Sequence, residues 1–327
     1  MAGIGKRMRP HTLTVPKPLI PVAGKPIVQR LVEDIAETCE ESIEEIAFII
    51  GDFGKAVEEK LKNIASDLGA KASIYHQEEA LGTAHAILCA KNSLEGPVIV
   101  AFADTLFKAN FKLDNSVDGT IWVNKIEDPS AFGVVKLDEQ GTITDFVEKP
   151  ETFVSDLAII GIYYFKDGAY LKDELQYLID HNIKDKGEFQ LTNALENMKE
   201  KGTRFTTGEV IEGLDCGNKN ATVYTNQRVL ANKADDSWIH ESVKKENSLI
   251  IPPCFIGENV RLKNTIIGPY VSIGNNSEID HAVISNSIIQ ENSEISGVNL
   301  SNSMVGNNTS IVKELNDLSV GDFNTIK

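Results

Sequence analysis

A change in the spacing of apolar residues near residue 247 constrains the fold most. Beyond it, branched aliphatic residues recur at steps of five or six and are separated mainly by Asn, Ser and Gly. They are Ile256, Leu262, Ile267, Ile273, Ile279, Ile284, Ile289, Ile295, Leu300, Val305 and Ile311. A short repeat of this kind indicates a solenoid, here a parallel β-helix over residues 247–327. An ordinary β-sandwich is the alternative, but its strands would show period-two alternation at wider spacing.

Residues 1 to about 230 follow a different pattern, in which strand-like and helix-like segments alternate. Strands are expected at 46–50, 72–76, 97–103, 120–124, 133–137, 142–148, 158–165 and 204–211. Helices are expected at 27–35, 57–68, 83–91, 168–180, 188–200 and 219–232. This alternation predicts an α/β domain over residues 1–232, with a mostly parallel sheet and helices on both faces. The intervening residues, 233–246, look like a linker.

Composition excludes several classes of protein. The 327 residues are 42% hydrophobic and 24% charged, as in globular proteins of about two domains. The net charge of −16 argues against a nucleic-acid partner. No apolar run reaches the ~18 residues that span a membrane, and no signal peptide is visible. Four scattered cysteines fit reduced thiols, so we expect a cytoplasmic protein.

The N-terminal loop has features of a phosphate-binding segment. Gly3 and Gly5 would let backbone N–H groups approach a phosphate, and Arg7 and its basic neighbours add charge. The loop is not a dinucleotide fingerprint, because Met8 stands where the third glycine would be, and a Walker motif is absent. A flexible basic N-terminus is the alternative.

A second motif, Pro16-Lys17-Pro18-Leu19-Ile20-Pro21, follows closely. Three prolines in six residues forbid a helix and stiffen the backbone. A lysine on such a segment is a well-placed point charge for a phosphate, although a solvated loop lysine is the alternative.

Together the two motifs, Gly-x-Gly-x-Arg-x-x-Pro and Pro-Lys-Pro-Leu-x-Pro, resemble the opening of the sugar-1-phosphate nucleotidyltransferases. The resemblance is greatest to glucose-1-phosphate thymidylyltransferases that carry a β-helical tail. Ile256-Gly257, Ile267-Gly268 and Ile273-Gly274 likewise resemble the hexapeptide repeat of left-handed β-helices. The resemblance implies a Rossmann-like nucleotidyltransferase sheet followed by a C-terminal left-handed β-helix. In that family a buried strand precedes the glycine-rich loop, so we expect a first strand that this chain lacks.

The resemblance also implies a nucleotide site. The segment from Gln77 to Ala84 looks like the base-reading loop, in which Gln77 would bond the base and Gly82 would leave room for it. Asp104, at the end of a buried strand, and Asp215 would bind Mg²⁺. A surface amide is the alternative for Gln77, and turn or cap roles are the alternatives for both aspartates.

A sugar site is implied by the remaining motifs. Gly133 would back onto the sugar, Glu148 would contact its hydroxyl groups, and Lys149 would hold its phosphate. Glu188 fits a further sugar segment more loosely, with a helix first-turn acid as the alternative. The catalytic charges implied by the resemblance are those of Arg7, Lys17 and Lys149.

These motifs predict one reaction and leave two alternatives. The predicted enzyme joins an NTP, dTTP favoured, to a sugar 1-phosphate, glucose 1-phosphate favoured, with Mg²⁺, and releases pyrophosphate. We also expect a homo-oligomer. The first alternative is a non-catalytic homologue that binds a nucleotide sugar. The second is a β-helix acyltransferase, for which His281 is the lone candidate base in the repeat region.

Overall fold

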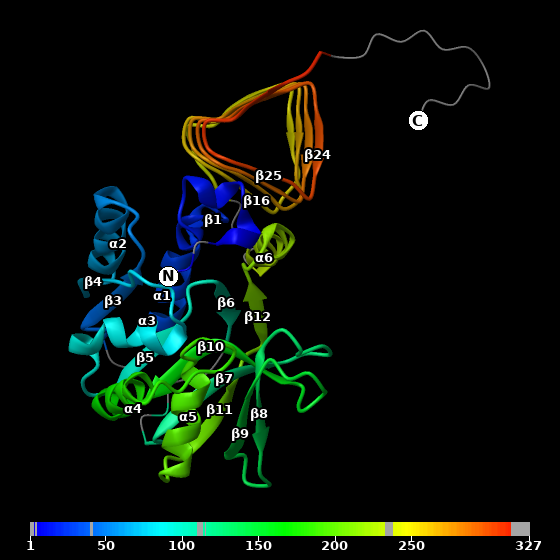
Figure 1. The fold of residues 1–327 in the computed structure, drawn as a ribbon. Helices are drawn as coiled ribbons and strands as arrows, with labels where there is room; N and C mark the ends of the chain where they lie inside the picture. The colour runs from blue at the N-terminus through cyan, green and yellow to red at the C-terminus, as the bar shows by residue number, and fades with distance from the viewer. Residues whose placement is uncertain are drawn as a thin grey trace. The chain divides into compact units, whose positions relative to one another are not determined.

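Figure 1 shows the fold in a computed structural model, which describes residues 3, 5–39, 42–109, 114, 116–232 and 238–314. The chain divides into two compact units. The first comprises Met1–Ile20 and Pro26–Asn218, and the second comprises Pro21–Lys25 and Lys219–Lys327. Within the described ranges, no helix has the length and apolar character needed to cross a bilayer.

The first unit is built on a mixed sheet with strand order β11-β7-β10-β8-β9, and β5 also pairs with β10. Its strands are β5 (Val98–Ala101), β7 (Gly119–Lys125), β8 (Gly133–Leu137), β9 (Ile143–Glu148), β10 (Leu157–Phe165) and β11 (Phe205–Glu209). Only the β11–β7 pairing is parallel among these described strands. The expected mostly parallel sheet therefore differs from the observed one. One reason is local, because the short turn between Asp138 and Thr142 makes β8 and β9 an antiparallel hairpin.

Two smaller sheets complete the strands of this unit. β3 (Glu45–Ile50) and β4 (Lys71–His76) are parallel and are connected through α2 (Lys55–Asp67), as alternating β and α segments predict. β6 (Thr105–Lys108) and β12 (Glu212–Asp215) form an antiparallel pair that the sequence did not predict.

Three helices, α3 (Thr83–Cys89), α4 (Gly168–Asp180) and α5 (Leu191–Glu200), bury apolar residues in one core with the main sheet. The remaining described α-helix of the unit is α1 (Ile27–Thr38). α4 has the predicted bounds, and the side chain of Asp167 caps it by accepting a hydrogen bond from the Tyr170 N–H at 3.0 Å. Leu171 and Leu175 of α4 and Leu195 of α5 pack in one cluster with Phe165 and Phe205 of the sheet.

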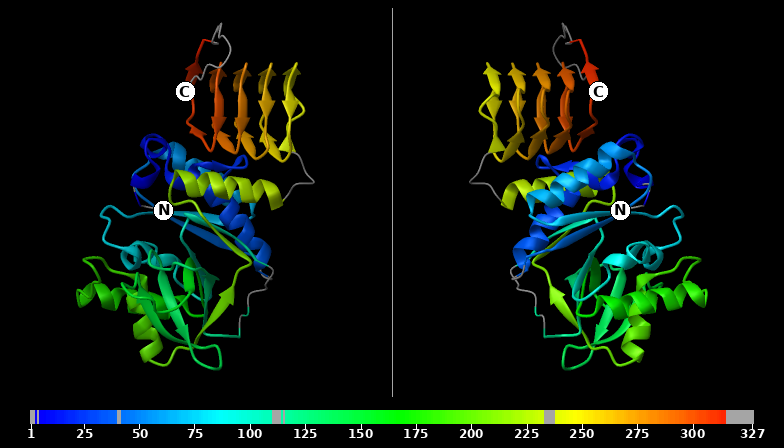
Figure 2. Two further views of the ribbon diagram at one scale, coloured as in Figure 1. Left: turned by 90° about the vertical axis from the view of Figure 1, so that its right-hand side faces the viewer. Right: turned by 90° about the vertical axis from the view of Figure 1, so that its left-hand side faces the viewer.

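The second unit contains the predicted parallel solenoid, whose three faces are visible along its axis in Figure 1 and from the side in Figure 2. The first sheet comprises β13 (Trp238–Ile239), β16 (Cys254–Ile256), β19 (Val271–Ile273), β22 (Ser287–Ile289) and β25 (Met304–Val305). The second comprises β14 (Lys244–Glu246), β17 (Arg261–Lys263), β20 (Glu278–Asp280), β23 (Glu294–Ser296) and β26 (Ser310–Val312). The third comprises β15 (Leu249–Ile250), β18 (Ile266–Ile267), β21 (Val283–Ser285) and β24 (Asn299–Ser301).

The solenoid core confirms the aliphatic repeat and refines its period. Ile256, Ile267, Ile273 and Ile284 are fully buried in a cluster that runs through the coils. Stacked positions are 17 residues apart in the first coils and 16 apart in later ones, which is shorter than three six-residue repeats. The solenoid also begins before residue 247. β13 and β14 lie inside the expected linker, and they pair with β16 and β17 of the next coil. Of that linker, 233–237 lie outside the described residues.

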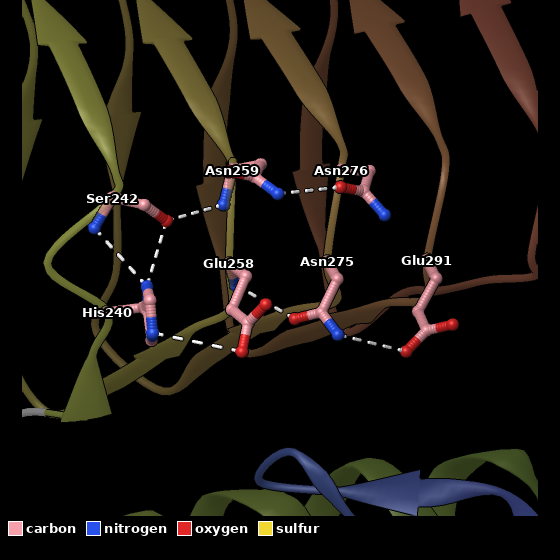
Figure 3. Close-up of polar contacts among 7 residues, drawn as sticks. All are labelled: His240, Ser242, Glu258, Asn259, Asn275, Asn276 and Glu291. Carbon is pink, nitrogen blue, oxygen red and sulfur yellow. Dashed lines mark hydrogen bonds and ion pairs between the residues drawn. The ribbon is translucent and has the colours of Figure 1, made fainter.

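Asparagine ladders support the corners of the solenoid (Figure 3). Asn259, Asn276 and Asn292 have φ of 56°, 58° and 56°, a left-handed conformation that asparagine tolerates better than most residues. Asn259 Nδ2 lies 3.1 Å from Asn276 Oδ1 of the next coil, as Figure 3 shows, and Asn276 Nδ2 lies 3.3 Å from Asn292 Oδ1 of the coil after that. The frequent asparagines of this region therefore serve the turns that separate the aliphatic strands.

The rest of the second unit packs on this solenoid. α6 (Lys219–Asn232) has the predicted bounds, and its Asn226 is fully buried. Asn226 Oδ1 accepts hydrogen bonds from the Ala23 N–H at 2.8 Å, next to β1 (Pro21–Val22), and from Ser272 Oγ of β19 at 2.7 Å. The short β2 (Lys25–Pro26) pairs with β1.

Candidate active site

Two aspartates distant in the sequence lie side by side where β6 and β12 meet. Asp215 ends β12 opposite Thr105, the first residue of β6, and Asp104 directly precedes that strand. The Cys216 N–H donates to the Asp104 carbonyl oxygen at 2.8 Å, which ties the two segments together. The unpredicted β6–β12 pair is therefore what brings together the two predicted metal ligands.

Lys17 joins this acidic pair. Its Nζ lies 2.9 Å from Asp104 Oδ2, and the Lys17 side chain is only 11% exposed. The prolines on either side set the lysine on a short 3₁₀ turn, Lys17–Leu19, in which the Leu19 N–H bonds the Pro16 carbonyl oxygen. The cation is thus held by a stiff segment rather than solvated on a loop.

The pKa of Asp215 reports the charges around it. Burial raises this pKa, and the Gly217 N–H, 2.8 Å from Asp215 Oδ1, lowers it. The charge of Asp104 raises it further, whereas Lys17 and Arg7 lower it. Four of the predicted charged residues therefore share one electrostatic environment, although Arg7 itself is exposed on the turn Lys6–Met8.

This donor set fits a divalent cation that also binds phosphate. Two neighbouring carboxylates, one with a raised pKa, would be stabilised by a cation between them. Mg²⁺ typically takes one or two carboxylates and completes its shell with water and substrate phosphate. In the described ranges no group of three or more His, Cys, Asp or Glu residues converges as a metal site, so an all-protein cage is not what these residues offer.

The glycine-rich loop lies against the Lys17 turn. Gly5 has φ of 60°, and its carbonyl oxygen accepts hydrogen bonds from the Met8 N–H and from Thr12 Oγ1 at 2.9 and 2.8 Å. A Cβ at Gly5 would lie 3.3 Å from Lys17 Cβ, whereas one at Gly3 would meet nothing within 4 Å. The structure therefore places Gly5 beside the charged cluster and gives Gly3 no packing role.

The predicted base-reading segment follows β4. Gln77 is 8% exposed, and its amide Nε2 lies 3.2 Å from the Gly82 carbonyl oxygen and 3.1 Å from His85 Nδ1. Gly82 has φ of 117°, and a Cβ there would lie 2.4 Å from the carbonyl oxygen of Phe189. Gly82 is thus required both by its backbone conformation and by the close approach of another segment.

Replacing Gly82 with alanine is expected to displace this segment. The new methyl would clash with the Phe189 backbone, and the residue would be strained. We expect KM for the NTP to rise by about tenfold or more, since ~1.4 kcal/mol is a factor of ten. Gly69→Ala is the matched control, because Gly69 has φ of 73° but open space around a Cβ. Equal effects of the two substitutions would contradict the packing argument.

The predicted sugar residues Gly133, Glu148 and Lys149 lie together at one end of the β8–β9 hairpin. Gly133 is paired with Glu148, and a Cβ at Gly133 would lie 3.1 Å from Glu148 Oε2. Lys149 has φ of 42°, and its Nζ is 3.4 Å from Glu148 Oε1. Burial, and then the charge of Glu148, raise the pKa of the Tyr163 phenol.

Aromatic packing connects the sugar residues to the aspartates. The rings of Phe102 and Tyr163 are 5.7 Å apart, and the Phe102 N–H bonds the Gly161 carbonyl oxygen at 2.9 Å. The Asp104 N–H in turn donates to the carbonyl oxygen of Phe102 at 2.8 Å. Phe102 thus links Tyr163 to the Asp104 segment, a contact that sequence reasoning missed although Phe102 lies in the segment that ends at Asp104.

Glu188 belongs to a segment that hydrogen-bonds to the base-reading segment. Gln190 Nε2 donates to Glu188 Oε2 at 3.1 Å, and Gln190 Oε1 accepts from Thr83 Oγ1 at 3.1 Å. Backbone bonds between Phe189 and the 81–84 segment add to this connection, with lengths of 2.8 and 2.9 Å. Thr83 and Gln190 were not predicted, because a spacing of 107 residues gives no signal in one sequence.

Comparisons with known proteins agree with this geometry. Residues 1–232 match the Nucleotidyl transferase family. The chain is 32% identical over 242 residues to the low-salt glycan biosynthesis nucleotidyltransferase of Haloferax volcanii, covering 71% of this chain and 65% of that protein. It is 36% identical over 185 residues to the mannose-1-phosphate guanylyltransferase catalytic subunit beta of Drosophila pseudoobscura pseudoobscura, covering 54% of this chain and 49% of that protein. The chain thus spans less than two thirds of the length of these relatives.

A solved structure has the same fold over most of the chain. It is UDP-glucose pyrophosphorylase complexed with UDP-glucose, with a TM-score of 0.58 at 24% identity, covering 71% of this chain and 97% of that one. At this identity the similarity shows the fold alone. The match over residues 1–232, more than half of the sequence, shows that this chain belongs to the Nucleotidyl transferase family.

Proposed function

We propose that this protein transfers a nucleotidyl group from an NTP to a sugar 1-phosphate and releases pyrophosphate. The observation that carries the proposal is the convergence of Lys17, Asp104 and Asp215, with Arg7 in the same electrostatic environment. Such a set binds phosphates and a divalent cation and contains no Ser–His or Cys–His nucleophile pair. Family membership and the named activities of the relatives support the same class of reaction.

The residues of the site act on charge and position. A sugar-phosphate oxygen, already an anion, attacks the α-phosphorus in line, so the reaction needs no general base. Arg7 binds the triphosphate and the departing pyrophosphate, Lys17 lies beside the reacting phosphates, and Lys149 binds the sugar phosphate. Bringing two anions together and neutralising their developing charge is the protein's main contribution.

Asp104 and Asp215 would hold the cofactor, Mg²⁺. Bound there, the cation would supply charge neutralisation for the phosphate oxygens. Lys17 bonds Asp104 in the structure, so its cation and the metal would share that carboxylate. The enzyme is therefore expected to lose activity in EDTA and to regain it with Mg²⁺.

The base and the sugar are proposed from resemblance. Thymidylyl transfer to glucose 1-phosphate is our first choice, and the activities of the relatives, which include guanylyl transfer to mannose 1-phosphate, define the competing reactions. A cytoplasmic location and a homo-oligomeric state belong to the same proposal.

A substrate panel tests the proposal. Pyrophosphate release would be measured with Mg²⁺ for dTTP, UTP, GTP, CTP and ATP, each against glucose 1-phosphate and mannose 1-phosphate. We expect the highest turnover with dTTP and glucose 1-phosphate. Turnover with another pair would keep the reaction and correct the specificity.

If no pair in the panel released pyrophosphate, one of the two alternative functions would be favoured. Binding of a nucleotide sugar without turnover would indicate a regulatory protein. Binding of acetyl-CoA would indicate acyl transfer, although both ring nitrogens of His281 already have partners, Asp280 Oδ1 at 2.8 Å and Asn264 Nδ2 at 3.3 Å.

A further inference from the structure

We propose that His85 is a positioning residue that, together with the Gly82 carbonyl oxygen, holds both N–H groups of the Gln77 amide and thereby selects the class of nucleobase. Held in this way, Gln77 offers one acceptor, Oε1, and no free donor. The site would then favour bases with a ring N–H on the edge that is read, namely thymine, uracil and guanine, over adenine and cytosine. This inference rests on the proposed function, in which Gln77 faces the base.

The backbone decides which end of the amide faces inward. Gln77 Nε2 lies 3.2 Å from the carbonyl oxygen of Gly82. A carbonyl oxygen can only accept a hydrogen bond, so the amide nitrogen and not the amide oxygen must face it. The Ala86 N–H, which bonds that carbonyl oxygen at 3.1 Å, and the close approach of Phe189 to Gly82 hold the carbonyl in place.

His85 engages the second amide hydrogen. Its Nδ1 lies 3.1 Å from the same Gln77 Nε2. Because that nitrogen is a donor, Nδ1 must be the acceptor, which places the ring proton of neutral His85 on Nε2. His85 lies in the middle of α3, whose N-terminal residues are fixed by the bonds of Thr83 and Ala84 to the 189–191 segment. Both N–H groups of the Gln77 amide are therefore used within the protein.

The amide oxygen is left for a ligand. Gln77 Oε1 accepts no hydrogen bond from the residues that the structure describes. Several side-chain atoms of the described residues are buried without a partner, and Gln77 Oε1 is not among them. This oxygen is therefore accessible. Because Gln77 is only 8% exposed, a ligand that brings a donor to Oε1 is favoured, and one that brings a second acceptor is disfavoured.

The hydrogen-bonding groups of each nucleobase then determine which bases the site favours. Thymine and uracil present a ring N3–H, and guanine presents N1–H, whereas adenine N1 and cytosine N3 are acceptors. Adenine and cytosine could donate from their amino groups, but their ring nitrogens would then need an N–H donor from Gln77. Both such donors are engaged by Gly82 and His85.

The test compares two substitutions of His85. His85→Leu removes the acceptor and frees one N–H of the Gln77 amide, which could then donate to adenine N1 or cytosine N3, while the Gly82 carbonyl oxygen still holds the other N–H. His85→Asn keeps an oxygen acceptor near the position of Nδ1. Discrimination is measured as the ratio of kcat/KM for the preferred NTP to that for ATP, and KM for the sugar 1-phosphate is measured in parallel.

We expect His85→Leu to lower this ratio by about tenfold or more and to leave KM for the sugar phosphate unchanged, since a lost partner acts only on base reading. His85→Asn should retain the ratio within about threefold. In a Gln77→Ala background, His85→Leu should have no further effect on the ratio, because the two residues act as one unit. His76→Leu is the matched control, since the adjacent His76 is exposed and faces Glu58.

Three results would overturn the inference. Unchanged discrimination in His85→Leu would show that His85 does not hold the amide. A loss shared equally by all five NTPs and not rescued by His85→Asn would indicate a structural role in α3. A wild-type enzyme that transfers nucleotidyl groups without discriminating among bases would overturn this inference alone, whereas a wild type that binds no NTP would overturn the proposed function as well.

Discussion

Replacing Asp104 with asparagine is expected to lower kcat by about 10²–10³-fold, the usual effect of removing one preorganised charge from a transition state. Asp104 is bonded to Lys17 at 2.9 Å and neighbours Asp215 across the β6–β12 pair. The amide would still accept a hydrogen bond from Lys17, but it would bind a divalent cation weakly. The measurement is pyrophosphate release at saturating NTP, sugar 1-phosphate and Mg²⁺.

The Asp215→Asn variant distinguishes a role of Asp215 in catalysis from a role in stabilising the fold. Burial and Asp104 raise the pKa of Asp215, so folding disfavours its charged form. This carboxyl therefore stabilises the fold only when protonated, and that contribution is lost as the pH rises through its folded pKa. Asparagine retains an acceptor for the Gly217 N–H, so we expect lost activity without lost thermal stability near neutral pH.

Near-normal turnover in either variant would contradict the assignment of the metal ligands. Loss of activity together with a collapse of the melting temperature in Asp215→Asn would instead point to a structural role. Both variants are measured beside the wild type at several Mg²⁺ concentrations, since a weakened metal site is partly rescued by excess metal.

Replacing Phe205 with alanine is expected to have the largest effect on stability. Phe205 is fully buried, and its ring packs edge-on against Phe146 and Phe165 at centroid distances of 5.6 and 6.2 Å. Gly119 approaches the ring so closely that a Cβ there would lie 2.7 Å from Phe205 Cδ1. The substitution would leave a large cavity, and we expect it to lower the free energy of unfolding by about 3–5 kcal/mol.

Chemical denaturation followed by fluorescence would measure this loss. Phe153→Ala is the matched control, because that side chain is 72% exposed and should change the free energy of unfolding by less than about 0.5 kcal/mol. If Phe205→Ala were as stable as Phe153→Ala, the described core of the first unit would be wrong.

The elements set by local chemistry were the most predictable from the sequence. The helices 168–180 and 219–232 have their predicted bounds, and β8 coincides with the predicted strand 133–137. The step of five or six residues predicted the solenoid because each short strand contributes a buried aliphatic residue to the core, such as Ile267 of β18 and Ile284 of β21. Patterns of this kind are local, so one sequence contains them.

Long-range pairing could not be predicted in the same way. β10 accounts for most of the difference from a parallel sheet, since it runs antiparallel to β5, β7 and β8. The β6–β12 pair, which aligns Asp215 with Thr105, joins two four-residue strands too short to give a clear pattern. β14 falls in the predicted linker because Lys244 and Lys245 are charged, and in the structure all three residues of this strand are exposed.

For the candidate site, the resemblance predicted residue types and the fold brings several of them together. Lys17 with Asp104, and Gly133 with Glu148, lie together as the predicted roles require. The hydrogen-bond partners of other predicted residues, such as His85 beside Gln77 and Gln190 beside Glu188, were missed because these bonds depend on tertiary contacts.

The central claim is nucleotidyl transfer to a sugar phosphate, and phosphorus NMR of the reaction tests it most directly. With NTP, sugar 1-phosphate and Mg²⁺, we predict that the signals of both substrates decline together. Pyrophosphate and the coupled pair of signals of a nucleotide diphospho-sugar should grow in equal amounts. Unchanged substrates with every pair in the panel, or conversion of the NTP to a nucleoside monophosphate with the sugar phosphate untouched, would contradict the claim.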